Sequence, residues 1–184
     1  LDDRGAIFCW GPNPWNYPEL GYGVLDGSWQ QVSVGREFSC SLDGEGQVDC
    51  WGWYNSQGQT SNAPTGTGWV EVDAGYRGAC ARHQDGTVEC WGDDVVGAVT
   101  NTPTTSDFTM VRSARFQNCG IHDDGTVSCW GSDTWGQSSD NPGYGDFVDL
   151  DLGSDHVCAL RATGRIHCWG LDNDDQVADT PNTK

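Results

Sequence analysis

Short stretches in which apolar and polar residues alternate recur along the chain about every 40 residues. In one of them Val70, Val72 and Ala74 alternate with Glu71 and Asp73. A period of two is that of a β-strand with one buried face. The pattern therefore predicts short strands, and no segment shows the period of an amphipathic helix.

Each repeat contains three predicted strands followed by a connection rich in Gly, Pro and Thr. The first strand begins at an aromatic residue, which is Trp29, Trp69, Phe108 or Phe147. The second and third strands flank a turn that contains Gly46, Gly86, Gly125 or Gly164. Dipeptides such as Asp85-Gly86 are strong hairpin signals, because glycine adopts a positive φ without strain. The third strand ends in Cys-Trp-Gly, which begins at Cys9, Cys50, Cys90, Cys129 and Cys168.

Three or more short strands in each unit of about 40 residues are typical of a β-propeller blade. We predict an all-β, propeller-like array of four complete three- to four-stranded blades plus a partial blade. The whole chain, residues 1–184, forms one repeat domain. Its expected units are a partial unit 1–11, repeats at about 12–52, 53–92, 93–131 and 132–170, and a partial unit 171–184.

The two partial units carry an expectation about assembly. An exposed strand edge or apolar blade face favours pairing with another element. We expect the chain to be part of a longer polypeptide with further blades. The alternatives are completion by neighbouring copies, which would build a ring or a filament, and an isolated open array.

Composition narrows the class of protein. The 26 Gly and 7 Pro residues disfavour long helices, and no apolar run is long enough for a membrane-spanning helix. The net charge of −18 would repel a phosphate backbone, so we expect no nucleic-acid partner.

Eight of the nine cysteines form four pairs with a spacing of ten residues. A residue ten positions ahead, across a short turn, faces its partner on the adjacent strand. We predict the disulfides Cys40–Cys50, Cys80–Cys90, Cys119–Cys129 and Cys158–Cys168. Metal ligation is the alternative, but no Cys-x-x-Cys motif occurs. The cysteines indicate an oxidising compartment, so we expect a secreted or cell-surface protein. Cys9 is expected to be unpaired or paired to a residue outside the chain.

Several segments together resemble the regulator of chromosome condensation repeat. They are Gly153-Ser-Asp-His-Val-Cys-Ala-Leu160, Asp124-Gly-Thr-Val-Ser-Cys-Trp-Gly131 and Gly136-Gln137. The resemblance covers about residues 27–176 and implies a propeller that serves as a binding platform. Members of this family include a nuclear exchange factor and a secreted bacterial β-lactamase inhibitor. The paired cysteines and Asp175, in place of the Gly before Gln, depart from the family pattern.

No catalytic motif emerges from the sequence. No Gly-x-Ser-x-Gly, His-Glu-x-x-His or phosphate-binding glycine loop occurs. His83 and His122 share one repeat position with Asp43 and Arg161, so we expect exposed strand residues there. We therefore predict no enzymatic activity, no cofactor and no metal site.

The aromatic residues fall into two groups. Those at fixed repeat positions are expected to pack in the core: Trp10, Trp51, Trp91, Trp130, Trp169, Trp29, Trp69, Phe108 and Phe147. Others lie in connections where the repeat does not require them, and Trp and Tyr are enriched at interface hot spots. The candidate partner-binding residues are Trp15, Tyr17, Tyr22, Trp53, Tyr54, Trp135 and Tyr144.

These observations favour a non-enzymatic extracellular repeat protein that acts as a scaffold for protein recognition or assembly, with filament formation included. The partner is expected to be another protein or neighbouring copies of the chain. One alternative is a glycan-binding, lectin-like propeller, because loop aromatics and carboxylates suit sugar rings. Another is an enzyme inhibitor similar to the β-lactamase inhibitor of the family. A glycan array and an inhibition assay would separate the three.

Overall fold

Strands and turns make up the regular secondary structure of the described part of the chain. The computed structural model describes residues 5–9, 24–25 and 28–181. None of these residues belongs to a helix that is long and apolar enough to cross a membrane. The strands are β1 (Ile7–Phe8), β2 (Val24–Leu25), β3 (Trp29–Val34), β4 (Phe38–Asp43), β5 (Val48–Gly52), β6 (Trp69–Ala74), β7 (Gly78–His83), β8 (Val88–Gly92), β9 (Phe108–Ser113), β10 (Gln117–His122), β11 (Val127–Gly131), β12 (Phe147–Leu152), β13 (His156–Arg161) and β14 (Ile166–Gly170).

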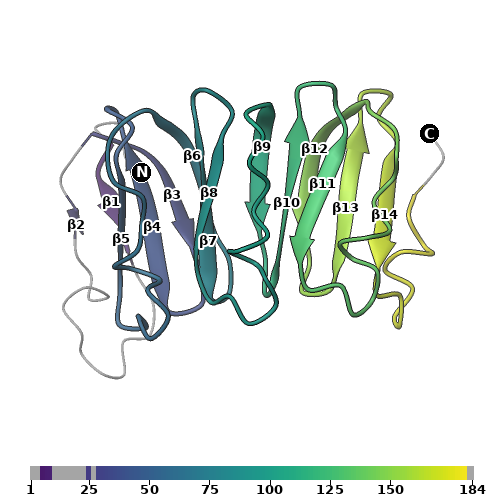
Figure 1. Cartoon of the computed structure of the whole chain (residues 1–184), viewed down its shortest axis with the longest axis horizontal. Helices are drawn as coiled ribbons and strands as arrows, with labels where there is room; N and C mark the ends of the chain where they lie inside the picture. Colours follow the sequence, from purple (N-terminus) through teal and green to yellow (C-terminus); the bar gives the residue numbers. More distant parts are fainter. Residues whose placement is uncertain (1–4, 10–23, 26–27, 182–184) are drawn as a thin grey trace.

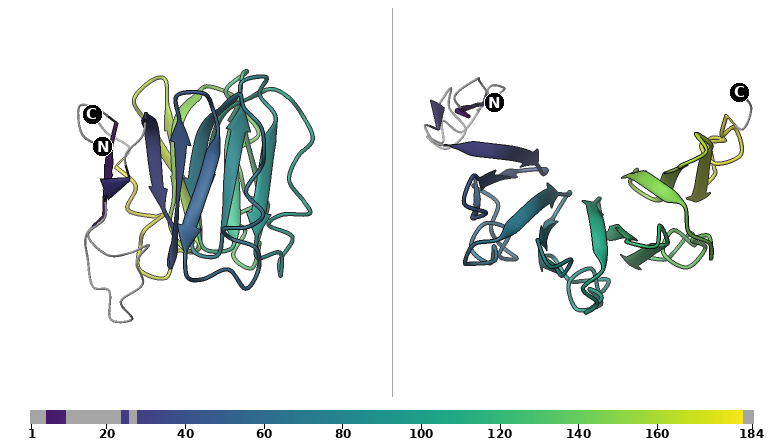
Figure 2. Two further views of the ribbon diagram at one scale, coloured as in Figure 1. Left: turned by 90° about the vertical axis from the view of Figure 1, so that its left-hand side faces the viewer. Right: turned by 90° about the horizontal axis from the view of Figure 1, so that it is seen from above.

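Strands β3 to β14 form four three-stranded antiparallel sheets, which we call blades 1 to 4. Blade 1 is β3–β5, blade 2 is β6–β8, blade 3 is β9–β11 and blade 4 is β12–β14. The blades stand side by side along an arc (Figures 1 and 2). The first strand of each blade packs against the first strand of the next, so these strands line the inner side of the arc. Strands β1 and β2 pair separately in a two-stranded sheet. The predicted all-β array of four complete blades is confirmed.

The hairpin turn between the second and third strands also contacts the next blade. In blade 3, Ile121 lies opposite Val127, and the chain turns at Asp124-Gly125, where Gly125 has a φ of 78°. Glycine adopts this left-handed conformation without strain. A Cβ at Gly125 would lie 2.7 Å from the backbone nitrogen of Asp146, which precedes blade 4. The glycine therefore serves both the turn and the close approach of the next blade.

Aspartates in these turns accept hydrogen bonds that lower their pKa. The Asp85 carboxylate accepts bonds from the hydroxyl and the backbone N–H of Thr87, at 2.7 and 2.9 Å. These bonds favour the charged form and lower the pKa of Asp85 from 3.8 to about 2.

Replacing Thr87 by valine is expected to raise the pKa of Asp85, because the hydroxyl makes the largest contribution to its lowering. The folded-state pKa lies below the unfolded value. The stabilising contribution of Asp85 is therefore present above pH 3.8 and is lost as the pH falls toward about 2. NMR titration of the Asp85 carboxyl carbon in both proteins measures the change. An identical pKa in Thr87→Val would contradict the role of the hydroxyl.

Each interface between neighbouring blades is an apolar core closed by a tryptophan. Between blades 1 and 2, Phe38, Val72 and Trp91 are buried together. The indole N–H of Trp91 donates to the carbonyl oxygen of Gln59 in the preceding connection, at 2.9 Å. Equivalent bonds join Trp130 to Ala98 and Trp169 to Gln137. The repeat aromatics that are buried are Trp69, Trp91, Trp130, Trp169, Phe108 and Phe147. Trp29 and Trp51 are half-buried, and Trp10 lies outside the described residues.

Polar side chains on the inner strands bond to the backbone of the next inner strand. The Gln31 amide donates to the carbonyl oxygen of Val72 and accepts from its N–H, both at 3.0 Å. Asp73 accepts a bond from the N–H of Ser113 at 2.7 Å. Burial raises the pKa of Asp73, and the bond from Ser113 partly opposes that rise. These contacts align the blades in addition to the apolar packing.

Blade 4 has the equivalents of the residues that contact the next blade elsewhere, but no described blade covers the face on which they lie. Asp151 occupies the repeat position of Asp73, but it accepts a bond from the adjacent N–H of Leu152 at 2.9 Å. Gly164 is the equivalent of Gly125, yet a Cβ there would meet nothing within 4 Å. Among the described residues, this face is therefore open.

The expectation that further sequence or another copy completes the array stays a prediction. The 184-residue chain alone is expected to associate, because the open face of blade 4 exposes apolar area. Multi-angle light scattering should give a mass that exceeds one chain and rises with concentration. A monodisperse monomer with a freely reactive Cys9 would contradict this prediction.

One disulfide joins the second and third strands of every blade. Cys80 and Cys90 lie directly opposite each other in the register of β7 and β8, and Cys80 is fully buried. The bonds are Cys40–Cys50, Cys80–Cys90, Cys119–Cys129 and Cys158–Cys168, as the spacing predicts. Cys9 is free and half-buried.

Non-reducing peptide mapping is expected to recover four crosslinked peptides, each from a single blade. Removal of one bridge, for example by Cys119→Ala with Cys129→Ala, should lower the free energy of unfolding by about 2–3 kcal/mol, because the unfolded chain gains freedom. Chemical unfolding followed by tryptophan fluorescence measures the loss. Bridges between different blades, or eight free thiols, would show that the pairing is wrong.

Candidate functional site

The turns between the first and second strands of the blades share one conformation. In blade 2 the N–H of Gly75 donates to the carbonyl oxygen of Gly78 at 2.8 Å. The equivalent bonds are Gly35 to Phe38, Ala114 to Gln117 and Gly153 to His156. Because these strands line the inner side of the arc, the turns meet near its centre (Figure 2). One repeat position is thereby brought together from four blades: Arg36, Tyr76, Arg115 and Ser154.

An open hollow of about 290 Å³ lies between these turns. Its lining includes Val34 at the end of β3 and Leu152 at the end of β12. A Cβ on Gly75 would lie 2.1 Å from the carbonyl oxygen of Ala114, and the N–H of Tyr76 donates to that oxygen at 3.0 Å. The inner ends of blades 2 and 3 therefore approach closely because residue 75 is glycine.

Tyr76 lies at the centre of a group of basic and aromatic side chains. The Arg36 guanidinium donates to the Tyr76 hydroxyl and lies over the ring, 4.6 Å from its centre. Arg115 lies 5.5 Å from the same centre and 5.1 Å from that of Phe116. The Tyr76 and Phe116 rings meet edge to face at 6.3 Å. Aromatic faces attract guanidinium groups, so the rings hold the two arginines in place. We call Arg36, Tyr76, Arg77, Arg115 and Phe116 the axial cluster.

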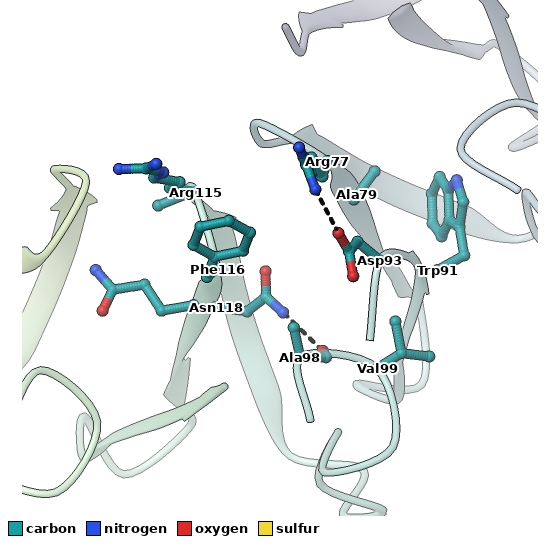
Figure 3. Close-up of a pocket in the computed structure, with 12 residues that line it drawn as sticks. Arg77, Ala79, Trp91, Asp93, Ala98, Val99, Arg115, Phe116 and Asn118 are labelled. Atoms are coloured by element: carbon teal, nitrogen blue, oxygen red, sulfur yellow. Dashed lines mark hydrogen bonds and ion pairs between the residues drawn. The ribbon is translucent and has the colours of Figure 1, made fainter. Parts of the chain in front are cut away.

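Arg77 extends toward the gap between blades 2 and 3 (Figure 3). Its guanidinium donates to the carboxylate of Asp93 at 3.2 Å, and this bond raises the pKa of Arg77. The Asp93 side chain is only 3% exposed. Figure 3 shows the Phe116 ring between Arg115 and the Arg77–Asp93 pair. The charge of Arg77 is therefore neutralised within the fold.

The axial cluster concentrates positive charge in an acidic protein. The chain has a net charge of −18, and three of its eight arginines belong to this cluster. Arg36 lies 3.6 Å from a Glu37 carboxylate oxygen in an exposed pair, and such pairs interact weakly. Arg115 is exposed and forms no ion pair with any carboxylate of the described residues. Two guanidinium groups thus remain available at the centre of the arc.

A hydrogen-bonded series of aspartate, histidine and serine lies at the opposite end of blade 3. His122 Nδ1 is 2.9 Å from Asp107 Oδ1, and its Nε2 is 2.8 Å from the Ser128 hydroxyl. The order of groups is that of a serine-hydrolase triad. The His122 side chain is only 12% exposed and its ring lies 4.2 Å from that of Phe108. The expectation that His122 is an exposed strand residue is therefore wrong, because Phe108 and Asp107 cover it.

The residue of blade 4 that is equivalent to His122 indicates a structural role for this repeat position. Its equivalent pair is Arg161 and Asp146, joined by three hydrogen bonds of 2.8 to 3.1 Å. An arginine does not act as a general base at neutral pH. The role common to both pairs is to hold the start of the first strand against the end of the second. Among the described residues, no group of three or more His, Cys, Asp or Glu side chains forms a potential metal site.

Two segments of the chain match the Regulator of chromosome condensation (RCC1) repeat, at residues 29–59 and 147–176. They contain blade 1 and blade 4. Solved structures extend the likeness over most of the chain. The entire ectodomain of the Physcomitrella patens receptor kinase CR4 superposes with a TM-score of 0.69 at 28% sequence identity, over 83% of this chain and 41% of that one. The chain has the fold of an RCC1-type β-propeller.

Two further solved structures superpose on most of the chain. The CRINKLY WD40 ectodomain of the Arabidopsis thaliana receptor kinase ACR4 superposes with a TM-score of 0.66 at 28% identity, over 80% of this chain and 52% of that one. Yeast RCC1 (Prp20), solved bound to Kap60, superposes with a TM-score of 0.63 at 19% sequence identity. The superposition covers 78% of this chain and 43% of that one. The chain thus spans about half the length of these structures or less. No curated protein matches its sequence significantly.

Two of the aromatic residues predicted to bind a partner lie at the same end of the RCC1-type array as the axial cluster. Trp53 and Tyr54 follow β5, and the N–H of Tyr54 donates to the carbonyl oxygen of Glu37 at 3.5 Å. The Trp53 side chain is half exposed, and its ring meets that of Tyr54 edge to face at 6.5 Å. These two residues therefore extend the surface around the cluster.

Of the remaining predicted residues, Tyr144 lies away from the axial cluster. Tyr144 stacks on Phe147 at 5.5 Å and on the guanidinium of Arg161 at 4.7 Å, at the opposite end of blade 4. Trp135 is half exposed in the connection after β11. Trp15, Tyr17 and Tyr22 lie outside the described residues.

The axial cluster was not among the sequence-predicted residues. Arg36, Tyr76 and Arg115 differ in type, and about 40 residues separate each from the next. The residues that follow Gly35, Gly75 and the equivalent Ala114 share one repeat position. Comparison of this position between the repeats would have identified the three residues, because the fold places it near the centre of the arc.

Proposed function

We propose that this chain forms part of an extracellular RCC1-type propeller that recognises a protein ligand through its axial cluster. Support for the location comes from the four disulfides, which persist in oxidising compartments. The 28% sequence identity with two receptor-kinase ectodomains also supports an extracellular location.

The observation that carries the proposal is the pair of available guanidinium groups around Tyr76. Arg and Tyr are enriched at the residues that dominate binding energy in protein interfaces. They lie on turns that a packed scaffold holds in place, which is the usual setting of a binding surface. Arg115 is exposed without a carboxylate partner among the described residues, in a chain with three times as many acidic as basic residues.

The proposed role is non-catalytic. The Asp107–His122–Ser128 series has the order of a triad, but blade 4 replaces the histidine with Arg161 at the same structural position. A shared structural task explains both pairs. The proposal therefore assigns ligand recognition, and no reaction, to this part of the propeller.

Selection from a random peptide display library on the immobilised chain tests the proposal. We expect enriched peptides to lose binding to Arg36→Gln and Arg115→Gln, since both substitutions remove a charge from the axial cluster. The control is Arg165→Gln, which removes an exposed arginine from the β13–β14 turn at the other end of blade 4. Peptides that bind all three variants equally, or no enrichment at all, would overturn a recognition role for the cluster.

A further inference from the structure

The chemistry of the axial cluster restricts the class of ligand, an inference that rests on the proposed function. We infer that the cluster binds a peptide segment with two carboxylates, one held by Arg36 and the other by Arg115. The argument uses the state of each guanidinium, the hollow between them and the charge around them.

Arg115 is arranged to accept an external carboxylate. Its guanidinium lies over two rings, Tyr76 and Phe116, at 5.5 and 5.1 Å. The attraction to these rings uses none of the guanidinium N–H donors, which leaves them for a ligand. A carboxylate matches two of these donors in a bidentate pair, which is among the stronger hydrogen bonds in proteins.

Arg36, in blade 1, is held in position by Tyr76 of blade 2. It donates one N–H to the Tyr76 hydroxyl, and its only carboxylate contact in the described residues is Glu37 at 3.6 Å. Its side chain is 46% exposed, so the remaining donors are accessible. Because Arg36 and Arg115 both lie over Tyr76, the two sites sit at a fixed separation set by that ring.

The hollow beside Tyr76 suits the part of a ligand peptide that links its two acidic side chains. Val34, which is 71% exposed, and Leu152 supply apolar surface there.

The surroundings favour a short acidic segment over a polyanion or a sugar ring. Glu37 and Asp155 occupy the next position of the turns in blades 1 and 4, and the whole chain carries −18 charges. A sulfated glycan or a nucleic acid would meet this repulsion along its whole length, whereas a segment with two carboxylates meets it only beside the two arginines. The guanidinium groups of Arg36, Arg77 and Arg115 already lie over the Tyr76 ring, which leaves less of it for a sugar to stack on.

Fluorescence anisotropy with fluorescein-labelled peptides tests the inference. The probes carry two glutamates separated by one to four glycines, and the matched probes carry glutamines. We expect the best diglutamate probe to bind at least about tenfold more tightly than its glutamine match, and Arg36→Gln and Arg115→Gln each to remove about tenfold. Arg165→Gln should leave the affinity unchanged. Probes with one glutamate should respond to only one of the two cluster substitutions.

Three outcomes would overturn the inference. They are equal affinity for the glutamate and glutamine probes, an equal loss in Arg165→Gln, and tighter binding of a heparin oligosaccharide than of any diglutamate probe. Thermal unfolding of each variant shows whether it is folded. If library peptides depend on the cluster but contain no acidic pair, the recognition role stands and the inferred ligand chemistry is wrong.

Discussion

Replacing Gly75 by alanine is expected to lower the free energy of unfolding by about 1–3 kcal/mol, the usual range for overpacking. The added Cβ would lie 2.1 Å from the carbonyl oxygen of Ala114, which is backbone and cannot rotate away. The inner ends of blades 2 and 3 would have to separate, and the bond from the Tyr76 N–H to that oxygen would lengthen. Chemical unfolding with the disulfides intact measures the loss.

Gly143→Ala provides the control for this substitution. A Cβ at Gly143 meets nothing within 4 Å, so its unfolding free energy should stay within about 0.5 kcal/mol of the parent. Because Tyr76 follows Gly75 directly, binding of the diglutamate probe should also weaken in Gly75→Ala and not in Gly143→Ala. Equal stability of the two variants would show that the blades do not depend on this close approach.

Asp73→Ala is expected to lower the free energy of unfolding by about 1–3 kcal/mol, because it leaves a buried N–H without its acceptor. Asp73 accepts hydrogen bonds from the Ser113 N–H and the Ser33 hydroxyl, across two different blade interfaces. Asp73→Asn keeps an acceptor oxygen and should cost much less. Urea unfolding of the three proteins at neutral pH measures the difference.

Asp151→Ala is the matched control, because Asp151 has the same repeat position on the open inner strand of blade 4. Its loss should change the free energy of unfolding by no more than about 0.5 kcal/mol. Burial raises the folded-state pKa of Asp73, so its contribution to the free energy of unfolding becomes less favourable as the pH rises through that pKa. Equal losses in Asp73→Ala and Asp151→Ala would contradict a role at the blade interface.

The sequence predicts the repeat architecture because local physics determines it. Alternation marks the strands, and glycines such as Gly125, with a φ of 78°, mark the turns that join them. Cysteines ten residues apart in a hairpin can only face each other, as Cys119 and Cys129 do. Each of these signals lies within one unit, so the units, their strand order and their bridges follow from spacing alone.

The axial cluster depends on contacts between units, which spacing within one unit does not show. Arg36 and Tyr76 meet because equivalent turns converge, and Arg115 joins them only after blade 3 is in place. Exposed aromatics were a weaker guide. Tyr144 has the residue type of a binding contact, but it stacks on Phe147 and Arg161 at the opposite end of its blade. His122 likewise has the residue type of a surface position, but its ring bonds to Asp107 and Ser128.

The placement of the disulfides determines how the array would respond to a pulling force. No disulfide joins two of the four blades, so apolar packing, hydrogen bonds and the ion pair between Glu71 and Arg112 hold neighbouring blades together. Under tension the blades would detach one at a time, while each bridge, closing a sequence separation of 10, withholds about 35 Å of extended chain. A protein tethered at a surface and pulled by its ligand would lengthen in short steps, and the reducing power of its surroundings would set the length of each step.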